Sequence, residues 1–258
     1  MVTLLLKKSY QHKDLKEIKF NDLWNSYGVF TTMRVVGKNK KILFFKEHID
    51  NLIKSLKIYR LDKNGLKKKI LQLIKINLIK KKKNFDHLLR VAVNQKMISI
   101  SLRKRIKPKL NFTLKLVNYK RIDPEHKNLK YKKIINFLKK LDNSMSDIAL
   151  YKNKKILETG TSNLLFIRKN KIYTPIKNFY EGTTYKFFLK KFKNIKKINI
   201  SIDSLNDYDE IILIGSGKGV ASVNRIEKTD WKRKSLKNYR FLSKIYAKAL
   251  KNCPRYKG

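Results

Sequence analysis

The chain has 258 residues, of which 42% are hydrophobic and 11% aromatic. This composition excludes a disordered chain, and the length allows one large domain or two small ones with a sizeable core. No apolar run approaches the ~18 residues of a membrane span, and the first residues lack the charge order of a signal peptide. We therefore expect a soluble, cytoplasmic protein. The single Cys253 excludes an internal disulfide and a cysteine metal cluster, and we expect no metal site.

The formal net charge of +45 would ordinarily favour nucleic acid or another anionic surface as a partner. The excess is mostly lysine, spread from end to end among many Asn and Ile residues, whose codons are also rich in A and T. Arginine, the residue that best reads base edges, is sparse. A biased genome therefore explains the charge without a nucleic-acid partner. The densest block, in residues 79–85, is interpreted as a solvated helix end.

The first 115 residues predict an α+β layer with two helices on one side of the strands. Alternating and β-branched residues indicate strands, with one turn expected at Gly37–Lys41. Apolar residues at positions 49, 52, 53, 56 and 59 have the spacing of a helix. Strands are expected in 26–46, with hairpins in 87–105 and 110–121, and helices in 47–61 and 64–83.

The pattern changes after Asp123-Pro124, a pair that breaks regular structure. We place a linker at 116–123, between an N-terminal domain of residues 1–115 and a C-terminal domain of residues 124–258. Short strands with basic or polar turns follow, and one pair encloses a glycine-rich loop. Helices are expected in 129–143, 183–192 and 235–252, and strands in 147–175 and 197–227.

Three separated turns carry small polar residues beside apolar strands: GTSN at 160–163, EGTTYKFF at 181–188 and GSGKGV at 215–220. Small residues before a helix leave backbone N–H groups that can face an anion, and threonine hydroxyls add donors. Taken alone, the second turn is more simply an N-cap. The glycine loop has neither the P-loop spacing nor that of a dinucleotide fingerprint.

Together these segments resemble the class IV, or fold type IV, pyridoxal-phosphate family, which includes branched-chain and D-amino-acid aminotransferases and 4-amino-4-deoxychorismate lyases. The resemblance runs from about residue 25 to about residue 227. It implies a two-domain fold type IV enzyme that forms a homodimer, with an N-terminal α/β sandwich-like domain and a C-terminal β-barrel-like domain with helices. The ordered motif is Glu158, Asn163, Phe166, Tyr173-Thr174-Pro175, Gly182 and Thr184.

The resemblance assigns Glu158 to the pyridine nitrogen of pyridoxal 5'-phosphate. A carboxylate there keeps the ring nitrogen protonated, so that the ring can draw electrons from a substrate carbanion. The resemblance also implies that Tyr131 lies near the phenolic oxygen of the cofactor; the alternative is a tyrosine that packs within a helix. The other implied cofactor contacts are Asn163 and, for the phosphate, Thr183, Thr184, Ser216 and Gly217.

The family places its catalytic lysine about thirty residues before the glutamate, at the start of a helix, in Lys-x-x-Asn-Tyr or a close variant. Lys127 fits this register with Tyr131, although Lys130 replaces the usual asparagine. We identify Lys127 as the residue that would carry the cofactor covalently and then act as base and acid. Lys130 is the alternative.

One departure concerns the phosphate. The family has an arginine in a helical His-x-x-Arg-Leu motif, and Asn51 stands in its place here, so a bidentate charged contact is lost. Lys54, one turn later on the same helix face, is a possible substitute. His48 keeps its family position, for which a structural role is expected.

Phe30-Thr31-Thr32 resembles the lyases more than the aminotransferases, which have Phe-Glu-Gly there, and it would place the catalytic candidate Thr32 near the cofactor. Phe30 and Arg90 are the expected substrate contacts, Arg90 for a carboxylate, with Arg103 and Arg105 as weaker candidates. The resemblance favours 4-amino-4-deoxychorismate lyase, which yields 4-aminobenzoate and pyruvate for folate synthesis. The alternatives are a branched-chain or D-amino-acid aminotransferase and a basic nucleic-acid-binding protein without enzymatic activity.

Overall fold

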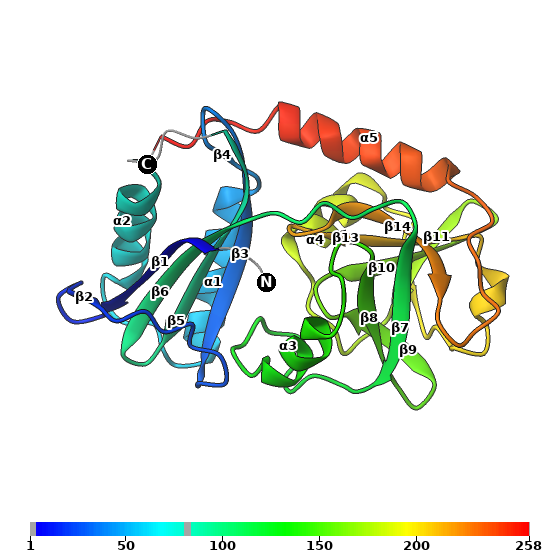
Figure 1. The fold of residues 1–258 in the computed structure, drawn as a ribbon, viewed down its shortest axis with the longest axis horizontal. Helices are drawn as coiled ribbons and strands as arrows, with labels where there is room; N and C mark the ends of the chain where they lie inside the picture. Colours follow the sequence, from blue (N-terminus) through cyan, green and yellow to red (C-terminus); the bar gives the residue numbers. More distant parts are fainter. Residues whose placement is uncertain (1–3, 80–83, 258) are drawn as a thin grey trace. The chain divides into compact units, whose positions relative to one another are not determined.

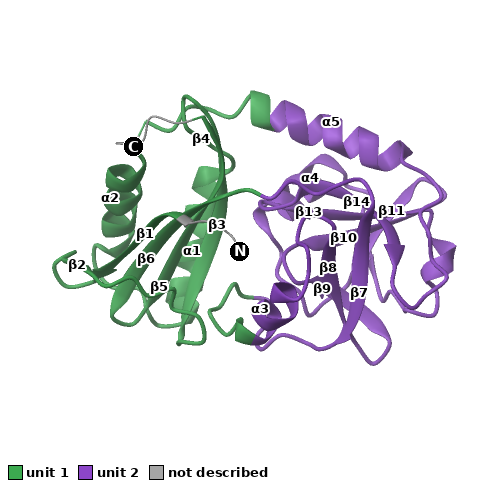
Figure 2. Ribbon diagram, viewed as in Figure 1, with its two compact units in different colours: residues 1–105, 126–132, 250–258 green, residues 106–125, 133–249 purple. Residues whose placement is uncertain are grey.

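The computed structural model describes residues 4–79 and 84–257, which form a mixed α/β fold with two sheets (Figure 1). The chain divides into two compact units (Figure 2). Unit 1 consists of residues 1–105, 126–132 and 250–258, and unit 2 of residues 106–125 and 133–249. Most of the predicted lysine block lies outside the described residues, at positions 80–83.

Unit 1 contains an antiparallel sheet of six strands in the order β2-β1-β6-β5-β3-β4. Both of its helices pack on one face of this sheet, as the sequence predicts, because their apolar stripes meet the inward side chains of β3, β5 and β6 in one buried cluster. The elements are β1 (Leu4–Gln11), β2 (Glu17–Ile18), β3 (Gly28–Gly37), β4 (Lys41–Ile42), α1 (Phe45–Ile58), α2 (Leu66–Ile79), β5 (Phe85–Asn94) and β6 (Met97–Lys104).

The segment 126–132 belongs to unit 1 because it runs along the edge of β3. The Phe30 amide donates to the Lys127 carbonyl at 2.9 Å, and the Leu129 amide donates to the Gly28 carbonyl at 2.9 Å. Gly28 permits this approach, since an added Cβ would lie 2.7 Å from Cδ1 of Leu129 in the segment and 2.3 Å from the Val93 carbonyl oxygen of β5. Lys127 therefore lies in an extended segment, and the expectation that it begins a helix is wrong.

Unit 2 contains a mixed sheet of eight strands in the order β12-β11-β10-β13-β14-β7-β8-β9. Its strand β7 corrects one prediction: residues 110–121 form no hairpin of the N-terminal layer, because β7 is a single strand that pairs in parallel with β8 and β14. The strands are β7 (Phe112–Asn118), β8 (Ser146–Lys152), β9 (Lys155–Thr159), β10 (Asn163–Arg168), β11 (Lys171–Pro175), β12 (Lys196–Ile198), β13 (Glu210–Gly215) and β14 (Gly219–Ile226).

The remaining helices are α3 (Lys132–Lys139), α4 (Thr183–Lys191) and α5 (Lys237–Lys251). Helix α3 is shorter than the predicted 129–143. At its start, Leu129 is held by the edge of β3, and after its end the Asp142 carboxylate accepts from the Ser144 amide in a turn. No helix in the described part of the chain is long and apolar enough to cross a bilayer.

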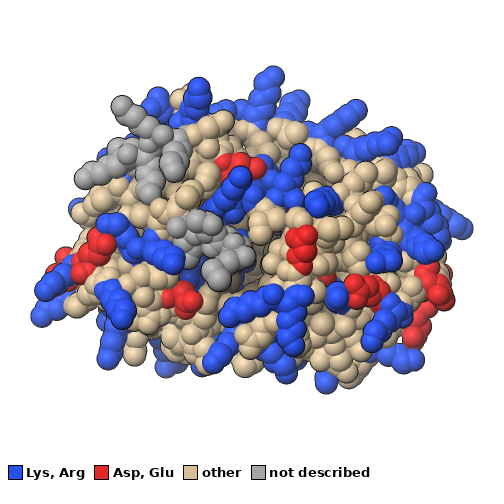
Figure 3. Space-filling view, viewed as in Figure 1, with Lys and Arg blue, Asp and Glu red and all other residues tan. Residues whose placement is uncertain are grey.

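Lysine and arginine side chains are distributed over both units on the face drawn in Figure 3, with acidic side chains among them. They do not gather there into one cationic stripe of the kind that tracks a nucleic-acid backbone. This distribution agrees with a compositional origin of the charge.

His48 links helix α1 to strand β3 inside unit 1. Its Nδ1 lies 2.9 Å from the Thr31 hydroxyl, and both residues are buried. Burial, and to a smaller extent the positive charge of Lys127, lowers the pKa of His48 from 6.5 to about 3. The ring is therefore neutral in the folded protein at any pH near 7.

We predict that His48 makes the protein less stable in mild acid. The unfolded chain binds a proton at this residue near pH 6.5 and the folded chain does not, so the free energy of unfolding falls as the pH drops below 6.5. Between pH 7 and pH 5, wild type should lose about 2 kcal/mol more than His48→Gln. Urea unfolding across this pH range measures the difference. Parallel declines in the two proteins would contradict the assignment.

Candidate functional site

One face of the unit 1 sheet carries four of the predicted residues. Alternation along β3 directs Phe30 and Thr32 away from the helix-covered face, and the strand register sets Thr32 opposite Arg90 of β5. Phe30 belongs to a small cluster on this face, against which Trp24 and Tyr131 pack. The predicted substrate contacts Phe30 and Arg90 therefore share one surface with Thr32 and Tyr131.

The Arg90 guanidinium is held by aromatic rings and one carbonyl. Its Cζ lies 3.6 Å from the centroid of Trp24 and 5.1 Å from that of Phe30. Its Nη1 donates to the Asp22 carbonyl at 2.8 Å, whereas Nε and Nη2 are buried without a hydrogen-bond partner. Burial lowers the pKa of Arg90 to about 9, so the group stays charged at neutral pH. Two buried donors on a cation match a carboxylate.

Lys127 and Tyr131 lie beside these residues. Lys127 Nζ is 5.0 Å from the Phe30 ring centroid, and Tyr131 stacks on Trp24 at 5.8 Å. Tyr131 precedes helix α3, so it does not pack as a helical residue. The alternative Lys130 is exposed, and its Nζ donates to the Asn25 carbonyl at 3.2 Å. These positions favour Lys127 over Lys130, and its catalytic role stays a prediction.

The two weaker carboxylate candidates differ in their surroundings. Arg105 Nη1 binds the Asp86 carboxylate at 3.2 Å, which commits it to an ion pair. Arg103 lies near enough to Arg90 to help lower its pKa, and strand parity directs it to the same face. Arg103 is therefore the better candidate for a second carboxylate contact. On α1, Asn51, which stands in place of the family arginine, is half-buried, and the possible substitute Lys54 is exposed.

In unit 2, Glu158 of β9 is paired with an arginine that the sequence analysis missed. Arg121 Nε donates to Oε1 at 2.6 Å and Nη2 donates to Oε2 at 3.2 Å, and both side chains are buried. The Tyr180 amide also donates to Oε2, at 3.4 Å. Arg121 Nη2 further donates to the Pro124 carbonyl at 2.6 Å. The available signal was a lone arginine two positions before Asp123-Pro124 in a lysine-rich chain.

Asn163 connects the motif strand to helix α4. Its Nδ2 donates to the Tyr180 carbonyl at 2.6 Å, and its Oδ1 accepts from the Gly182 amide at 3.1 Å. Gly182 is the N-cap of α4, so Asn163 fixes the loop that leads into Thr183 and Thr184. Asn163 also pairs with Ile214 at the end of β13. The start of α4 and the glycine loop are thereby brought to one end of the unit 2 sheet.

This end of the sheet contains polar groups that lack protein partners. The hydroxyls of Ser162 and Thr184 are buried and accept or donate no hydrogen bond. Ser162 lies against Gly215, where an added Cβ would come 3.2 Å from its Oγ, and Ser216 and Gly217 form the turn that follows. Unbonded hydroxyls beside a helix N-terminus and a glycine turn suit a phosphate.

Asp147 holds the GTSN turn in place. Its Oδ2 accepts from the Thr161 hydroxyl at 2.5 Å and its Oδ1 accepts from the Ile148 amide at 2.8 Å. Burial raises the pKa of Asp147, and Lys218 of the glycine loop opposes that rise. Lys218 Nζ donates to the Asn143 carbonyl at 2.6 Å. Buried polar contacts thus fix Asp147 at the GTSN turn and Lys218 in the glycine loop.

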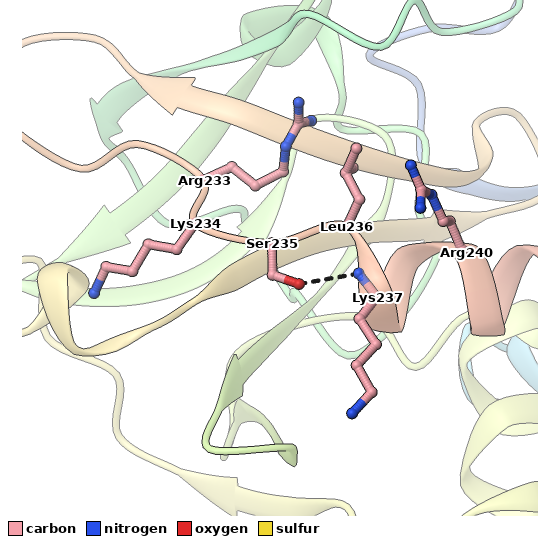
Figure 4. A pocket seen from close by; sticks show the side chains of 6 residues that line it. All are labelled: Arg233, Lys234, Ser235, Leu236, Lys237 and Arg240. Carbon is pink, nitrogen blue, oxygen red and sulfur yellow. Dashed lines mark hydrogen bonds between the residues drawn. The ribbon is translucent and has the colours of Figure 1, made fainter.

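A cationic hollow at the start of α5 is not a second anion site. Its four basic side chains, Arg233, Lys234, Lys237 and Arg240, extend in different directions (Figure 4). The first N–H groups of the helix already have acceptors: Ser235 Oγ receives the Lys237 amide, and the buried Glu210 carboxylate receives the next two amides. The hollow is therefore the surface of an internally capped helix.

The sequence profile described as amino-transferase class IV matches residues 28–226, more than half of the chain. The chain belongs to the class IV aminotransferase family. This family consists of enzymes that use pyridoxal 5'-phosphate, which confirms the predicted enzyme class and cofactor class. No curated protein matches the sequence.

Three solved structures illustrate the similarity of fold. A branched-chain aminotransferase from Thermoproteus uzoniensis with norvaline has TM-score 0.76 and 16% identity, covering 93% of each chain. An aminotransferase from Brucella abortus bound to the cofactor PLP has TM-score 0.71 and 16% identity, covering 94% of this chain and 99% of that one. A proposed 4-amino-4-deoxychorismate lyase from Legionella pneumophila has TM-score 0.67 and 18% identity, covering 85% and 91%. These likenesses confirm the predicted fold type IV architecture.

We predict that the buried pair Arg121–Glu158 is a large contributor to the stability of unit 2. Arg121→Met leaves a buried carboxylate without its cation, and we expect a loss of about 3–5 kcal/mol in the free energy of unfolding. Lys197→Met is the matched control, because it breaks the exposed Lys197–Glu181 pair of the same 2.6 Å separation and should cost less than about 1 kcal/mol. Equal losses in urea unfolding would refute the prediction.

Proposed function

We propose that this protein is a 4-amino-4-deoxychorismate lyase, which converts its substrate into 4-aminobenzoate and pyruvate. The observation that carries the proposal is Arg90, a charged guanidinium with two buried donors beside the rings of Trp24 and Phe30. Such a surface accepts a carboxylate attached to a flat, unsaturated ring better than the branched aliphatic side chain of an amino acid. The sequence Phe30-Thr31-Thr32, which resembles the lyases, agrees with this reading.

The residues of unit 2 fit pyridoxal 5'-phosphate, because the donor groups there include two buried hydroxyls without partners. We propose that Ser162, Thr183, Thr184 and the turn at Ser216-Gly217 hold the phosphate. Glu158, with its charge compensated by Arg121, would hold the pyridine nitrogen. The bound cofactor supplies an electron sink for the carbanion of the substrate.

We assign proton transfer to the unit 1 residues. Lys127 would hold the cofactor through its amine and would also be the base for the proton on the substrate carbon that bears the amine. The Phe30 amide binds the Lys127 carbonyl, and the Leu129 amide binds the Gly28 carbonyl. These two hydrogen bonds fix the Lys127 backbone at the edge of β3. Thr32, opposite Arg90 in the strand register, is positioned to orient the bound acid. Tyr131 is proposed for the phenolic oxygen of the cofactor.

We further propose that the enzyme is a cytoplasmic homodimer and that nucleic acid is not a partner. The homodimer is implied by the family resemblance, and an interface depleted in lysine would avoid repulsion between protomers of this charge. The scatter of lysines over both units supports the absence of a nucleic-acid partner.

The substrate assignment predicts release of pyruvate. Purified protein loaded with pyridoxal phosphate should absorb near 410–430 nm, a band expected of a lysine-bound cofactor, and should form pyruvate from aminodeoxychorismate. Lys127→Ala should lose both the band and the activity, and Lys130→Ala should keep both. Exchange of amino groups with 2-oxoglutarate in place of pyruvate release would instead identify an aminotransferase.

Arg90 should act through substrate binding. Arg90→Gln removes a charge-assisted, two-donor contact, and we expect kcat/KM to fall roughly 100-fold, mostly through KM. Arg90→Lys should recover little, because an ammonium cannot form the forked contact. The exposed Arg225→Gln on β14 is the control and should retain kcat/KM. An unchanged KM in Arg90→Gln would show that the substrate carboxylate binds elsewhere.

A further inference from the structure

Unit 1 contains a cavity of about 680 Å³ that takes no part in the proposed reaction. It lies where the end of β1, the β5–β6 turn and the start of α2 meet. The His12 amide donates to the Lys96 carbonyl at 2.9 Å, and Gln11 pairs with Met97, which joins the first two elements. Lys69 of α2 reaches the same place, since its Nζ donates to the His12 carbonyl at 2.6 Å.

The buried side chain in this cavity is His12, which is only 7% exposed. Both ring nitrogens are buried and neither makes a hydrogen bond of good geometry, although the Met97 backbone lies near enough to interact with the ring. A neutral imidazole carries one donor and one acceptor, so a buried ring without partners is a cost that a bound polar molecule would remove. Burial lowers the pKa of His12; the Met97 backbone opposes this, and Lys63 and Lys69 lower the pKa further.

The walls of the cavity are cationic and contain no carboxylate among the described residues. Lys63 and Lys69 are tethered across it, Lys63 Nζ to the Gln95 carbonyl at 3.4 Å and Lys69 Nζ to the His12 and Lys13 carbonyls. Of the nearby acids, Asp14 accepts from the Lys16 amide and Glu17 pairs with Lys8. Asp62, next to Lys63, is exposed and does not line the cavity. The lining residues are Gln11, His12, Lys13, Ile18, Lys63, Asn64, Leu66, Lys69, Gln95, Lys96 and Met97.

The start of α2 adds to the positive potential. Its first turn contains no acidic residue and holds Lys67, Lys68 and Lys69, although cations are unfavourable at a helix N-terminus. Leu66, the first residue of the helix, lines the cavity together with Ile18 and Met97. An anion with a carbon skeleton would offset the lysine charges and also contact these apolar side chains.

We propose that this cavity binds a small organic molecule carrying an oxyanion, through Lys63, Lys69 and Lys96 with the ring of His12 as a hydrogen-bond partner. The site is built within unit 1 and independent of the proposed reaction. Lysines are common on this surface, so the arrangement of cations alone would carry little weight. The buried imidazole without partners is what distinguishes the cavity from the rest of the lysine-rich surface.

The test uses the full-length protein saturated with pyridoxal phosphate, so that the cofactor phosphate site is already filled. Inorganic phosphate, citrate and glycerol 3-phosphate are each titrated at physiological ionic strength by calorimetry, with the ¹⁵N imidazole signals of His12 followed by NMR. We expect one of these anions to bind saturably and to shift the His12 signals. Tighter binding of the organic anions would show that the apolar wall contributes, and equal binding of phosphate would show that the oxyanion suffices.

Variants decide whether binding occurs at this cavity. Lys63→Met and Lys96→Met should each weaken binding by about tenfold, because each removes a cation that faces the ligand. Lys38→Met, in the exposed β3–β4 turn, is the matched control and should leave the affinity within about twofold. His12→Phe should weaken the binding measured by calorimetry; if it does not fold, the lysine variants carry the test. Absence of binding, or equal effects of all three lysine variants, would overturn the proposal.

Discussion

The candidate site of unit 1 depends on strand β3. One edge of β3 pairs with β5, and its two faces and its other edge each position a different set of residues. One face buries Val29, Met33 and Val35 against the helices. The opposite face carries Phe30 and Thr32, and the edge at Gly28–Phe30 binds the segment that contains Lys127. A register shift of one residue would exchange the two faces and move Phe30 into the helix-covered core. Packing of the core therefore also fixes the position of the candidate catalytic groups.

Unit 2 depends on a different principle, the compensation of polar groups away from water. Glu158 is paired with Arg121, Asn163 ties the Tyr180–Gly182 loop to β10, and Asp147 holds the GTSN turn. Each of these buried groups is bonded, whereas the hydroxyls of Ser162 and Thr184 are not. The Tyr185 hydroxyl, one residue further along α4, is a third buried group without a partner. The hydroxyls of Ser162 and Thr184 lie beside the helix N-terminus and the glycine turn, and they mark where a ligand atom belongs. This contrast supports a phosphate site more strongly than the small residues of the turns do alone.

The sequence predicted what local patterns determine. The helix-covered layer, the motif strands and the cap at Gly182 follow from periodicity and from small residues before a helix. Three features depend on pairings between distant segments, which no local pattern encodes: β7 joins a sheet that begins beyond residue 140, Lys127 binds the edge of β3, and Arg121 meets Glu158. Strand β1 was missed because lysines follow its apolar start; Lys7 is exposed, and Lys8 pairs with Glu17 of β2. The proposal of a lyase in place of an aminotransferase rests on the surroundings of Arg90, where Trp24 and Phe30 come from separate segments of the chain.

The lysine-rich composition makes arginine the more informative cation in this chain. The buried Glu158 is paired with an arginine, Arg121, whose side chain is 2% exposed. Arg105 and Arg34 are also largely buried, at 6% and 12%, although the Asp86 carboxylate that they share is 47% exposed. The lysine pairs Lys8–Glu17 and Lys197–Glu181 lie at the surface. Arginine is more weakly hydrated and forms forked contacts, so lysine cannot replace it at buried or two-point sites. Exceptions exist on both sides, since Arg168 is exposed and Lys218 is buried. A biased composition can therefore replace surface residues with lysine at little cost. The few buried arginines are kept where they bind an acidic group, either of the protein or, as we propose for Arg90, of a substrate.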